Sequence, residues 1–104
     1  MKIDDIVAAI DEDSILITSH ARREAEDDSL LLDEICFSVK NGEIIEDYSD
    51  DKPFPSCLIN GFNQEDEPIH TVWAYNEQKQ LAILITVYRP DPNLWLNWQQ
   101  RRKR

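Results

Sequence analysis

The spacing of apolar residues divides this chain into a helical first part and a strand-forming second part. Up to residue 40, apolar side chains recur every three or four positions, which is the period of a helix face packed on a core. This period predicts helices over residues 3–11 and 19–28, and a third helix whose apolar stripe runs from Leu31 to Val39. The β-branched stretch Ile15 to Thr18 between the first two helices fits either a short strand or an extended connection.

Polar residues mark where the second and third helices begin and end. Thr18 or Ser19 provides a hydroxyl that can cap the second helix, and Asp28 or Ser29 can cap the third. The pair Asn41–Gly42 follows the last apolar position of the third helix. We therefore expect this pair to end the helix in a left-handed conformation.

The apolar period changes to two after residue 42, which is the period of strands. Strands are predicted over residues 43–48, 56–62, 69–76 and 81–88. Helices followed by a run of strands indicate an α+β fold. We expect a single domain, residues 1–104, in which N-terminal helices pack on one face of a roughly four-stranded antiparallel sheet.

The last two predicted strands form a hairpin whose register decides which side chains share a face. If its loop holds three residues, His70 lies opposite Thr86 and diagonal to Tyr88. The other face is more apolar, so we expect it to meet the helices through Thr71, Trp73, Tyr75, Ile83, Ile85 and Val87. The His70 face is then the accessible one, although a slip of one residue would reverse the assignment for one strand.

The charge of the chain is divided between an acidic body and a basic end. The net charge is −10. Residues 1–80 carry 20 acidic and 6 basic side chains, whereas residues 81–104 carry 1 acidic and 5 basic ones. Such asymmetry predicts two electrostatic faces, of which the acidic one repels nucleic acid at long range.

The tail, residues 93–104, combines apolar and basic side chains. Leu94, Trp95 and Trp98 form an apolar group directly after the last strand, and we expect it to fold back over the sheet. The basic run that begins at Arg101 has three interpretations. It attracts nucleic acid, it pairs with an acidic surface, or it is a solvated and frayed end.

His20 is a candidate for contact with an anion. It lies in the first turn of the second predicted helix, where exposed N–H groups favour anions, and Arg22 and Arg23 are close in sequence. Together these side chains suit a phosphate. The alternative is that His20 only caps the helix or packs against the sheet.

Arg89 is a second candidate. Because it precedes a proline, its backbone is extended and its side chain projects from the sheet edge. There it either binds a phosphate or carboxylate group or forms a local salt bridge with Asp91 or Asp47.

Several classes of protein do not fit this sequence. Cys36 and Cys57 lie far apart without metal-like spacing, and we expect both to be free, buried thiols. No carboxylate spacing demands a metal, so no metal and no cofactor are expected. No apolar run is long enough to cross a membrane, and the acidic N-terminus does not fit a signal peptide. The expected compartment is the cytoplasm.

Five short segments carry a family resemblance. They are Ser19–Ala21, Lys40–Tyr48, Pro55–Leu58, Pro68–His70, and Thr86–Pro92 with Trp95. In order and spacing they resemble a bacterial family called domain of unknown function 4258, over about three quarters of the chain. This family is similar to the RelE, ParE and BrnT toxins of toxin–antitoxin systems. The resemblance implies a RelE-like fold and metal-independent cleavage of mRNA.

The resemblance also implies roles for individual residues. The catalytic candidates, which fall on its recurring positions, are His20, His70, Tyr88 and Arg89, and the candidates for RNA contact are Arg22, Arg23 and Thr86. The chain departs from the family pattern after His20. Where the family usually has basic residues, methionine and glycine, this chain has Glu24, Ala25, Asp28 and Ser29. This departure and the acidic body reduce the expectation of RNA cleavage.

Two functions from different classes therefore stand as hypotheses. The first is a metal-independent mRNA endoribonuclease of a type II toxin–antitoxin system. The second is a catalytically inactive toxin-fold module that binds a protein partner through Trp95, Trp98, Arg101 and Arg102. The partners implied are mRNA, a small antitoxin-like protein, and another copy of the chain. An acidic body that mimics nucleic acid is a third and weaker hypothesis.

Overall fold

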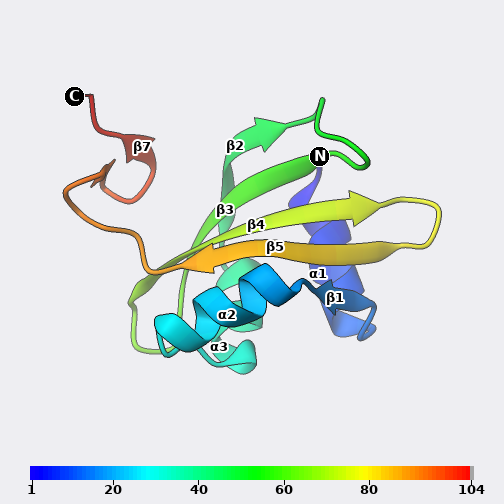
Figure 1. Cartoon of the computed structure of the whole chain (residues 1–104), viewed down its shortest axis with the longest axis horizontal. Helices are drawn as coiled ribbons and strands as arrows, with labels where there is room; N and C mark the ends of the chain where they lie inside the picture. The colour runs from blue at the N-terminus through cyan, green and yellow to red at the C-terminus, as the bar shows by residue number, and fades with distance from the viewer. Residues whose placement is uncertain (104) are drawn as a thin grey trace.

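Three helices lie against a five-stranded sheet in the computed structural model, which describes residues 1–103 (Figure 1). The helices are α1 (Ile3–Asp11), α2 (Ser19–Asp27) and α3 (Leu32–Lys40). The strands of the sheet are β1 (Ile15–Ile17), β2 (Glu43–Tyr48), β3 (Ser56–Phe62), β4 (Pro68–Asn76) and β5 (Leu81–Tyr88). In the tail, β6 (Trp95–Leu96) and β7 (Gln100–Arg101) form a separate two-stranded hairpin.

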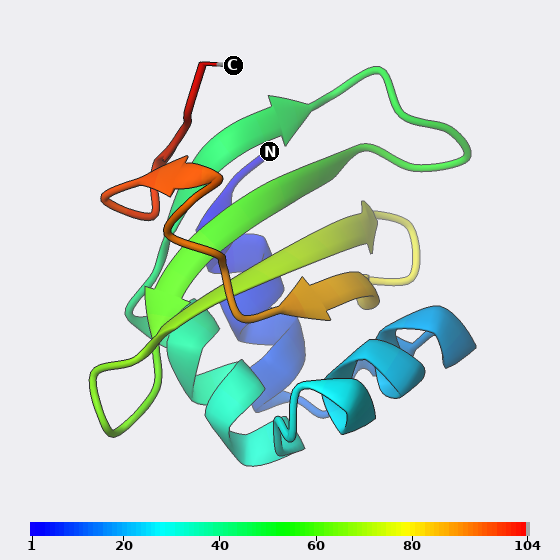
Figure 2. The same ribbon diagram turned by 60° about the vertical axis from the view of Figure 1, so that its left-hand side comes forward.

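The strands are arranged in the order β1-β5-β4-β3-β2. All neighbouring pairs are antiparallel except β1 and β5, which are parallel. The predicted α+β class is confirmed, but the sheet has five strands rather than four, because residues 15–17 pair along β5. Figure 2 shows the helices below the sheet and the tail, in orange and red, above it. None of the helices within residues 1–103 has the length and apolar character needed to cross a membrane.

Thr18 is the residue at which β1 ends and α2 begins. Its hydroxyl oxygen accepts a hydrogen bond from the Ala21 N–H group (3.1 Å) and its hydroxyl donates to the Leu84 carbonyl (3.0 Å). Of the two predicted caps, Thr18 is thus the one observed. The same side chain starts the helix and ties it to the sheet.

The predicted ends of α3 are wrong in two respects. Its N-cap is Leu31 rather than Asp28 or Ser29, and the Glu34 carboxylate accepts a hydrogen bond from the Leu31 N–H group (2.8 Å). Ser29 instead has a positive φ of 55° just after α2. At the other end Asn41 has a φ of −107°, and neither glycine has a positive φ, so the helix does not end in a left-handed conformation.

The two glycines are required by close packing rather than by backbone conformation. A Cβ atom on Gly61 of β3 would lie 1.8 Å from the Ser38 carbonyl oxygen of α3. One on Gly42 would lie 2.8 Å from the same oxygen. The last turn of α3 therefore rests directly on the backbone of β3, which only glycine allows.

The hairpin between β4 and β5 differs in register from the prediction. Asn76 pairs with Leu81, so the loop holds residues 77–80 rather than three residues. A bulge then adds Ile85 to β5, and His70 pairs directly with Tyr88 rather than with Thr86. His70 and Tyr88 are still neighbours on one face, as predicted. The longer loop and the bulge each shift β5 by one residue in the same direction, and a total shift of two residues keeps a side chain on its face.

The hydrophobic core lies between the sheet and the helices. Side chains at most 2% exposed in this layer include Ile6, Ile35, Val39, Cys57, Ile59, Ile69, Trp73, Leu84 and Val87. Trp73, Tyr75 and Val87 face the helices as predicted, whereas Ala82 and Leu84 take the places expected for Ile83 and Ile85. The shifted register of β5 explains this exchange.

Candidate binding site under the C-terminal tail

Three polar side chains form a row across the sheet on the face opposite the helices. Asn60 of β3 pairs with His70 of β4, and His70 pairs with Tyr88 of β5. Directly paired residues of antiparallel strands share a face. His70 is 0% exposed and Asn60 is 2% exposed. The expectation that the His70 face is accessible is therefore wrong at this position, because the tail covers it.

Both ring nitrogens of His70 are hydrogen-bonded. Nε2 lies 2.6 Å from the Trp98 carbonyl oxygen, and Nδ1 lies 3.1 Å from the Tyr88 hydroxyl. A carbonyl oxygen only accepts, so Nε2 carries the hydrogen and the neutral ring accepts from Tyr88 at Nδ1. Burial lowers the pKa of His70, and it raises the pKa of Tyr88 to about 12. Both side chains are consequently neutral near pH 7.

Trp95 is the apolar anchor of the tail. Its side chain is 4% exposed, and its ring meets the His70 ring edge to face with 4.5 Å between centroids. The Arg101 guanidinium carbon lies 4.7 Å from the centroid of the Trp95 ring on the tail's own hairpin. The prediction that the tail folds back over the sheet is confirmed. The Trp95 side chain, which was a candidate for partner contact, therefore packs against the chain's own sheet.

An ion pair holds the end of the tail hairpin to β2. The Arg101 Nε and Nη2 atoms donate to the two Glu46 carboxylate oxygens at 2.9 and 3.1 Å. The Tyr48 hydroxyl donates to the same carboxylate. Partial burial raises the pKa of Glu46, but hydrogen bonds from Arg101 and Tyr48 outweigh it and leave this pKa below its usual value. The charged pair therefore persists at neutral pH.

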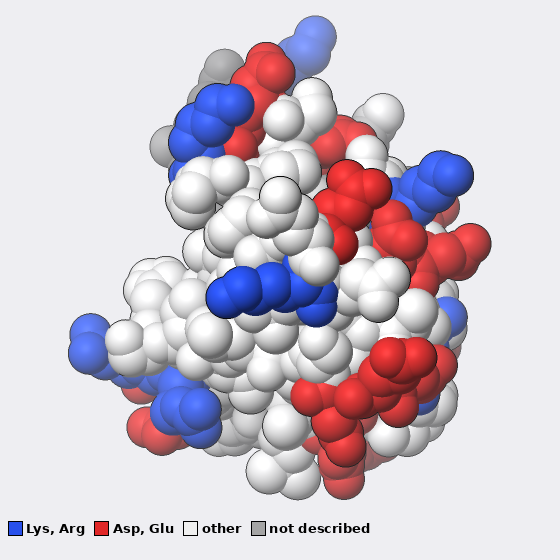
Figure 3. Space-filling view, turned by 90° about the vertical axis from the view of Figure 1, so that its right-hand side faces the viewer, with Lys and Arg blue, Asp and Glu red and all other residues white. Residues whose placement is uncertain are grey.

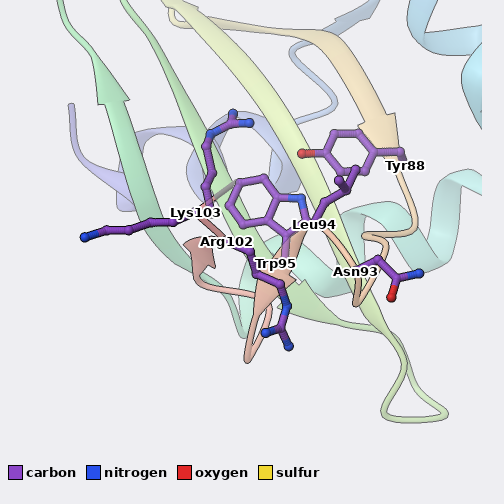
Figure 4. Close-up of a pocket in the computed structure, with 7 residues that line it drawn as sticks. Tyr88, Asn93, Leu94, Trp95, Arg102 and Lys103 are labelled. Carbon is purple, nitrogen blue, oxygen red and sulfur yellow. The ribbon is translucent and has the colours of Figure 1, made fainter.

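A pocket of about 430 Å³ opens between the tail and the end of β5 (Figure 4). Its lining gathers aromatic and cationic side chains, namely Tyr88, Asn93, Leu94, Trp95, Arg101, Arg102 and Lys103. Acidic side chains, in red, gather into a patch low on the face shown in Figure 3. In a chain of net charge −10, three cations around one concavity give it an electrostatic character opposite to that of the body. We call this concavity the tail pocket.

The structure does not bring the α2 candidates to the tail pocket. His20 is exposed, and its Nε2 atom lies 3.1 Å from a Glu24 carboxylate oxygen on the same helix. Arg22 lines a different pocket of about 220 Å³ between α2 and α3, and Arg23 is exposed. Thr86 is partly exposed on the His70 face of the sheet, opposite Val72. The predicted catalytic and RNA-contact residues thus do not form one cluster.

Arg89 forms the local ion pair that was one of its two predicted roles, but with another partner. Its Nη1 atom donates to Glu67 (3.2 Å) and its Nε atom to the Asp28 carbonyl (3.0 Å). The expected partners Asp91 and Asp47 are not used. The guanidinium therefore joins the end of α2 to the loop before β4.

Sequence reasoning missed the acidic residues that accept hydrogen bonds from the backbone at the end of β5. A Glu24 carboxylate oxygen accepts from the Val87 N–H group (3.3 Å), and an Asp28 oxygen accepts from the Arg89 N–H group (2.8 Å). These N–H groups lie beyond the short strand β1, so α2 side chains satisfy them. Glu46 was also missed, because only the folded tail reveals its partner. Asn60 did leave a signal, since a polar residue inside an apolar strand pattern requires an explanation.

The structure defines a small α+β protein whose helix-free sheet face is covered at one end by its own tail. The model of the family described as domain of unknown function (DUF4258) matches residues 17–89, so the chain belongs to this family. No curated protein and no solved structure matches the chain. The matched region begins in β1 and ends just after β5, so α1 and the tail lie outside it. Within residues 1–103, no group of three or more metal-ligating side chains is placed to hold a metal ion.

Proposed function

We propose that this chain is a non-catalytic binding module that takes an acidic, partly apolar segment of a protein partner into the tail pocket. The observation that carries this proposal is the concentration of cations there. Arg101, Arg102 and Lys103 meet beside Tyr88 and Leu94 in a chain that is otherwise strongly acidic. Among partners, the small antitoxin-like protein implied by the family resemblance has the size and class that suit such a module.

The exposed members of the pocket provide both components of a binding hot spot. Leu94 is 45% exposed and offers apolar surface. Arg102 donates from Nε to the Pro92 carbonyl (2.8 Å), and it has no carboxylate partner within residues 1–103. A held guanidinium with unused N–H groups is preorganised for a carboxylate. Trp95 supports the pocket from below rather than contacting the partner directly.

The state of the catalytic candidates supports binding over catalysis. His70 is fully buried with both nitrogens engaged, and Tyr88 has a pKa near 12, so neither is suited to act as a base at neutral pH. His20 and Arg89 are paired with carboxylates elsewhere. Glu24 and Asp28, which replace basic residues of the family pattern, serve the edge of β5 instead of a phosphate.

A second candidate function is RNA cleavage without a metal, and one observation favours it. The Tyr88 side chain lines the tail pocket while its hydroxyl is hydrogen-bonded to His70. A phosphate held by the pocket cations would then lie near a hydroxyl that donates its hydrogen bond to the imidazole Nδ1 atom, which can accept its proton. In this function the acidic body would work against the approach of a polyanion.

Fluorescence anisotropy with two labelled probes tests the proposal. The probes are a short peptide of alternating glutamate and leucine and a single-stranded RNA of equal charge. We expect wild type to bind the peptide more tightly than the RNA, and Arg102→Ala/Lys103→Ala to weaken peptide binding by about tenfold. The matched control Lys52→Ala/Lys79→Ala removes the same charge from loops outside the pocket and leaves binding near wild type. Equal loss in both double variants, or preference for the RNA, would contradict the proposal.

A further inference from the structure

The tail covers a polar row that the family domain by itself would expose. The family match ends at residue 89, whereas the groups that contact the His70 ring from the tail are the Trp95 side chain and the Trp98 carbonyl. Asn60 lies in the same row, and its Oδ1 atom is buried without a hydrogen-bond partner among the described residues. The covered row thus contains a buried acceptor that the tail does not satisfy.

The tail is joined to this face without sharing the hydrogen-bond ladder of the sheet. Strands β6 and β7 pair only with each other. The contacts with the sheet are the Trp98 carbonyl on His70, the Trp95 ring on the same imidazole, Arg101 on Glu46, and the Gln99 amide on Glu43. Detachment of the tail would therefore leave every strand pair of the main sheet intact.

The contacts that the tail makes with the sheet indicate which peptide groups this face can bind. His70 donates to a main-chain carbonyl and offers an aromatic edge to an indole. Six residues beyond that indole, a guanidinium meets the Glu46 carboxylate in a two-bond contact. The receiving face thus recognises a segment with a tryptophan and an arginine at this spacing.

Two left-handed residues form the turn of the tail hairpin. Asn97 and Trp98 have φ values of 52° and 67°. The left-handed region is tolerated by asparagine but costs free energy for a bulky residue such as tryptophan. The Trp98 carbonyl, fixed in this conformation, is the one that accepts from His70. The Gln99 N–H group donates to the Leu96 carbonyl (3.1 Å) across this turn, so the hairpin holds the conformation itself and presents the same carbonyl in cis or in trans.

We propose that the row beneath the tail is a peptide-docking site, and that the tail of a second copy of this chain occupies it in trans when the resident tail is detached. Charge complementarity favours a second copy as the source. Residues 93–104 carry four basic side chains and no acidic side chain, and the body that receives this tail is acidic. The site also receives the same residues in trans as it does in cis. Because every lining residue of the tail pocket except Tyr88 lies in the tail, docking in trans rebuilds the same pocket between two chains.

A charge-exchange pair of full-length variants tests this proposal. In Arg101→Glu the substituted tail is repelled by Glu46 of its own chain, and in Glu46→Arg the substituted site repels its own tail. Across the two chains, however, each tail meets a site of opposite charge. We expect each variant alone to be monomeric by size-exclusion chromatography with light scattering, and their equimolar mixture to form a heterodimer. The double variant Arg101→Glu/Glu46→Arg restores the pair in cis and remains monomeric.

The mixture staying monomeric while circular dichroism shows both variants folded would overturn the proposal. If either variant does not fold, labelled peptides of residues 93–103 provide the second measurement on wild type. The native peptide then binds at least about tenfold more tightly than a peptide with Arg101→Glu. Equal binding of the two peptides would also overturn the proposal. Neither measurement changes Arg102 or Lys103 of the protein, the residues whose substitution tests binding of an acidic segment. A negative result here is therefore distinguishable from a negative result for the acidic-segment proposal.

Discussion

Replacing Trp73 with alanine is expected to lower the free energy of unfolding by about 4 kcal/mol, the largest loss that we predict for a single side chain. Trp73 is 0% exposed and belongs to the central strand β4, where it faces the helices. Alanine would remove the largest fully buried side chain of the chain from the layer between the sheet and the helices. The cavity left behind cannot be closed by small movements of close-packed neighbours.

Urea denaturation of Trp73→Ala and Trp73→Phe checks this prediction. Trp73 Nε1 has no hydrogen-bond partner among the described residues, so phenylalanine removes an unsatisfied donor while retaining a ring. The phenylalanine variant should therefore lose less than half as much stability as the alanine variant. An alanine variant within about 1 kcal/mol of wild type would show that Trp73 does not anchor the helix layer.

Replacing His70 with alanine is expected to cost about 3 kcal/mol, because packing and two hydrogen bonds are lost together. The Trp98 carbonyl and the Tyr88 hydroxyl would each lose a partner, and the Trp95 ring would lose the imidazole that it contacts. The tail should detach more readily than in wild type. Urea denaturation measures the loss of stability, and increased exposure of Trp95 should quench and redshift tryptophan fluorescence.

The same side chain predicts a dependence of stability on pH. Because burial lowers the pKa of His70 in the folded state, protonation favours the unfolded state. The stability contributed by the neutral ring is present above the unfolded pKa of about 6.5 and decreases as the pH falls below it. His70→Phe keeps a ring of similar size but has no such titration. The stability difference between wild type and this variant should therefore decrease between about pH 7 and pH 5, and a constant difference would contradict the account.

The periodicity of apolar residues predicted the elements well because each one buries a single face. Residues 3–11, 43–48 and 56–62 have the bounds of α1, β2 and β3. Register is a different matter, since it depends on loop geometry. The left-handed residue Gln80 and the extra residue Ile85 moved β5 along β4, and the apolar pattern does not encode either feature.

The sequence allowed us to predict that His70 and Tyr88 belong to the candidate site, but not how the tail covers them. His70 and Tyr88 were expected to be neighbours because they occupy the two strands of one hairpin. The burial of His70 depends on a tail whose contacts arise only in the folded chain, through Trp95 and Trp98. Glu46 could not be distinguished from the other acidic residues by sequence, because its role depends on an arginine 55 residues away.

The most direct test of whether this protein binds a partner or cleaves RNA is an analysis of total RNA from a bacterial host in which the chain is expressed on induction. Wild type is compared with Tyr88→Phe, which removes only the hydroxyl that faces His70, and soluble expression of both is checked in parallel. The binding account predicts intact RNA and unchanged growth with either chain. Growth arrest with cleaved RNA in wild type, abolished by Tyr88→Phe, would contradict it and would favour a catalytic toxin.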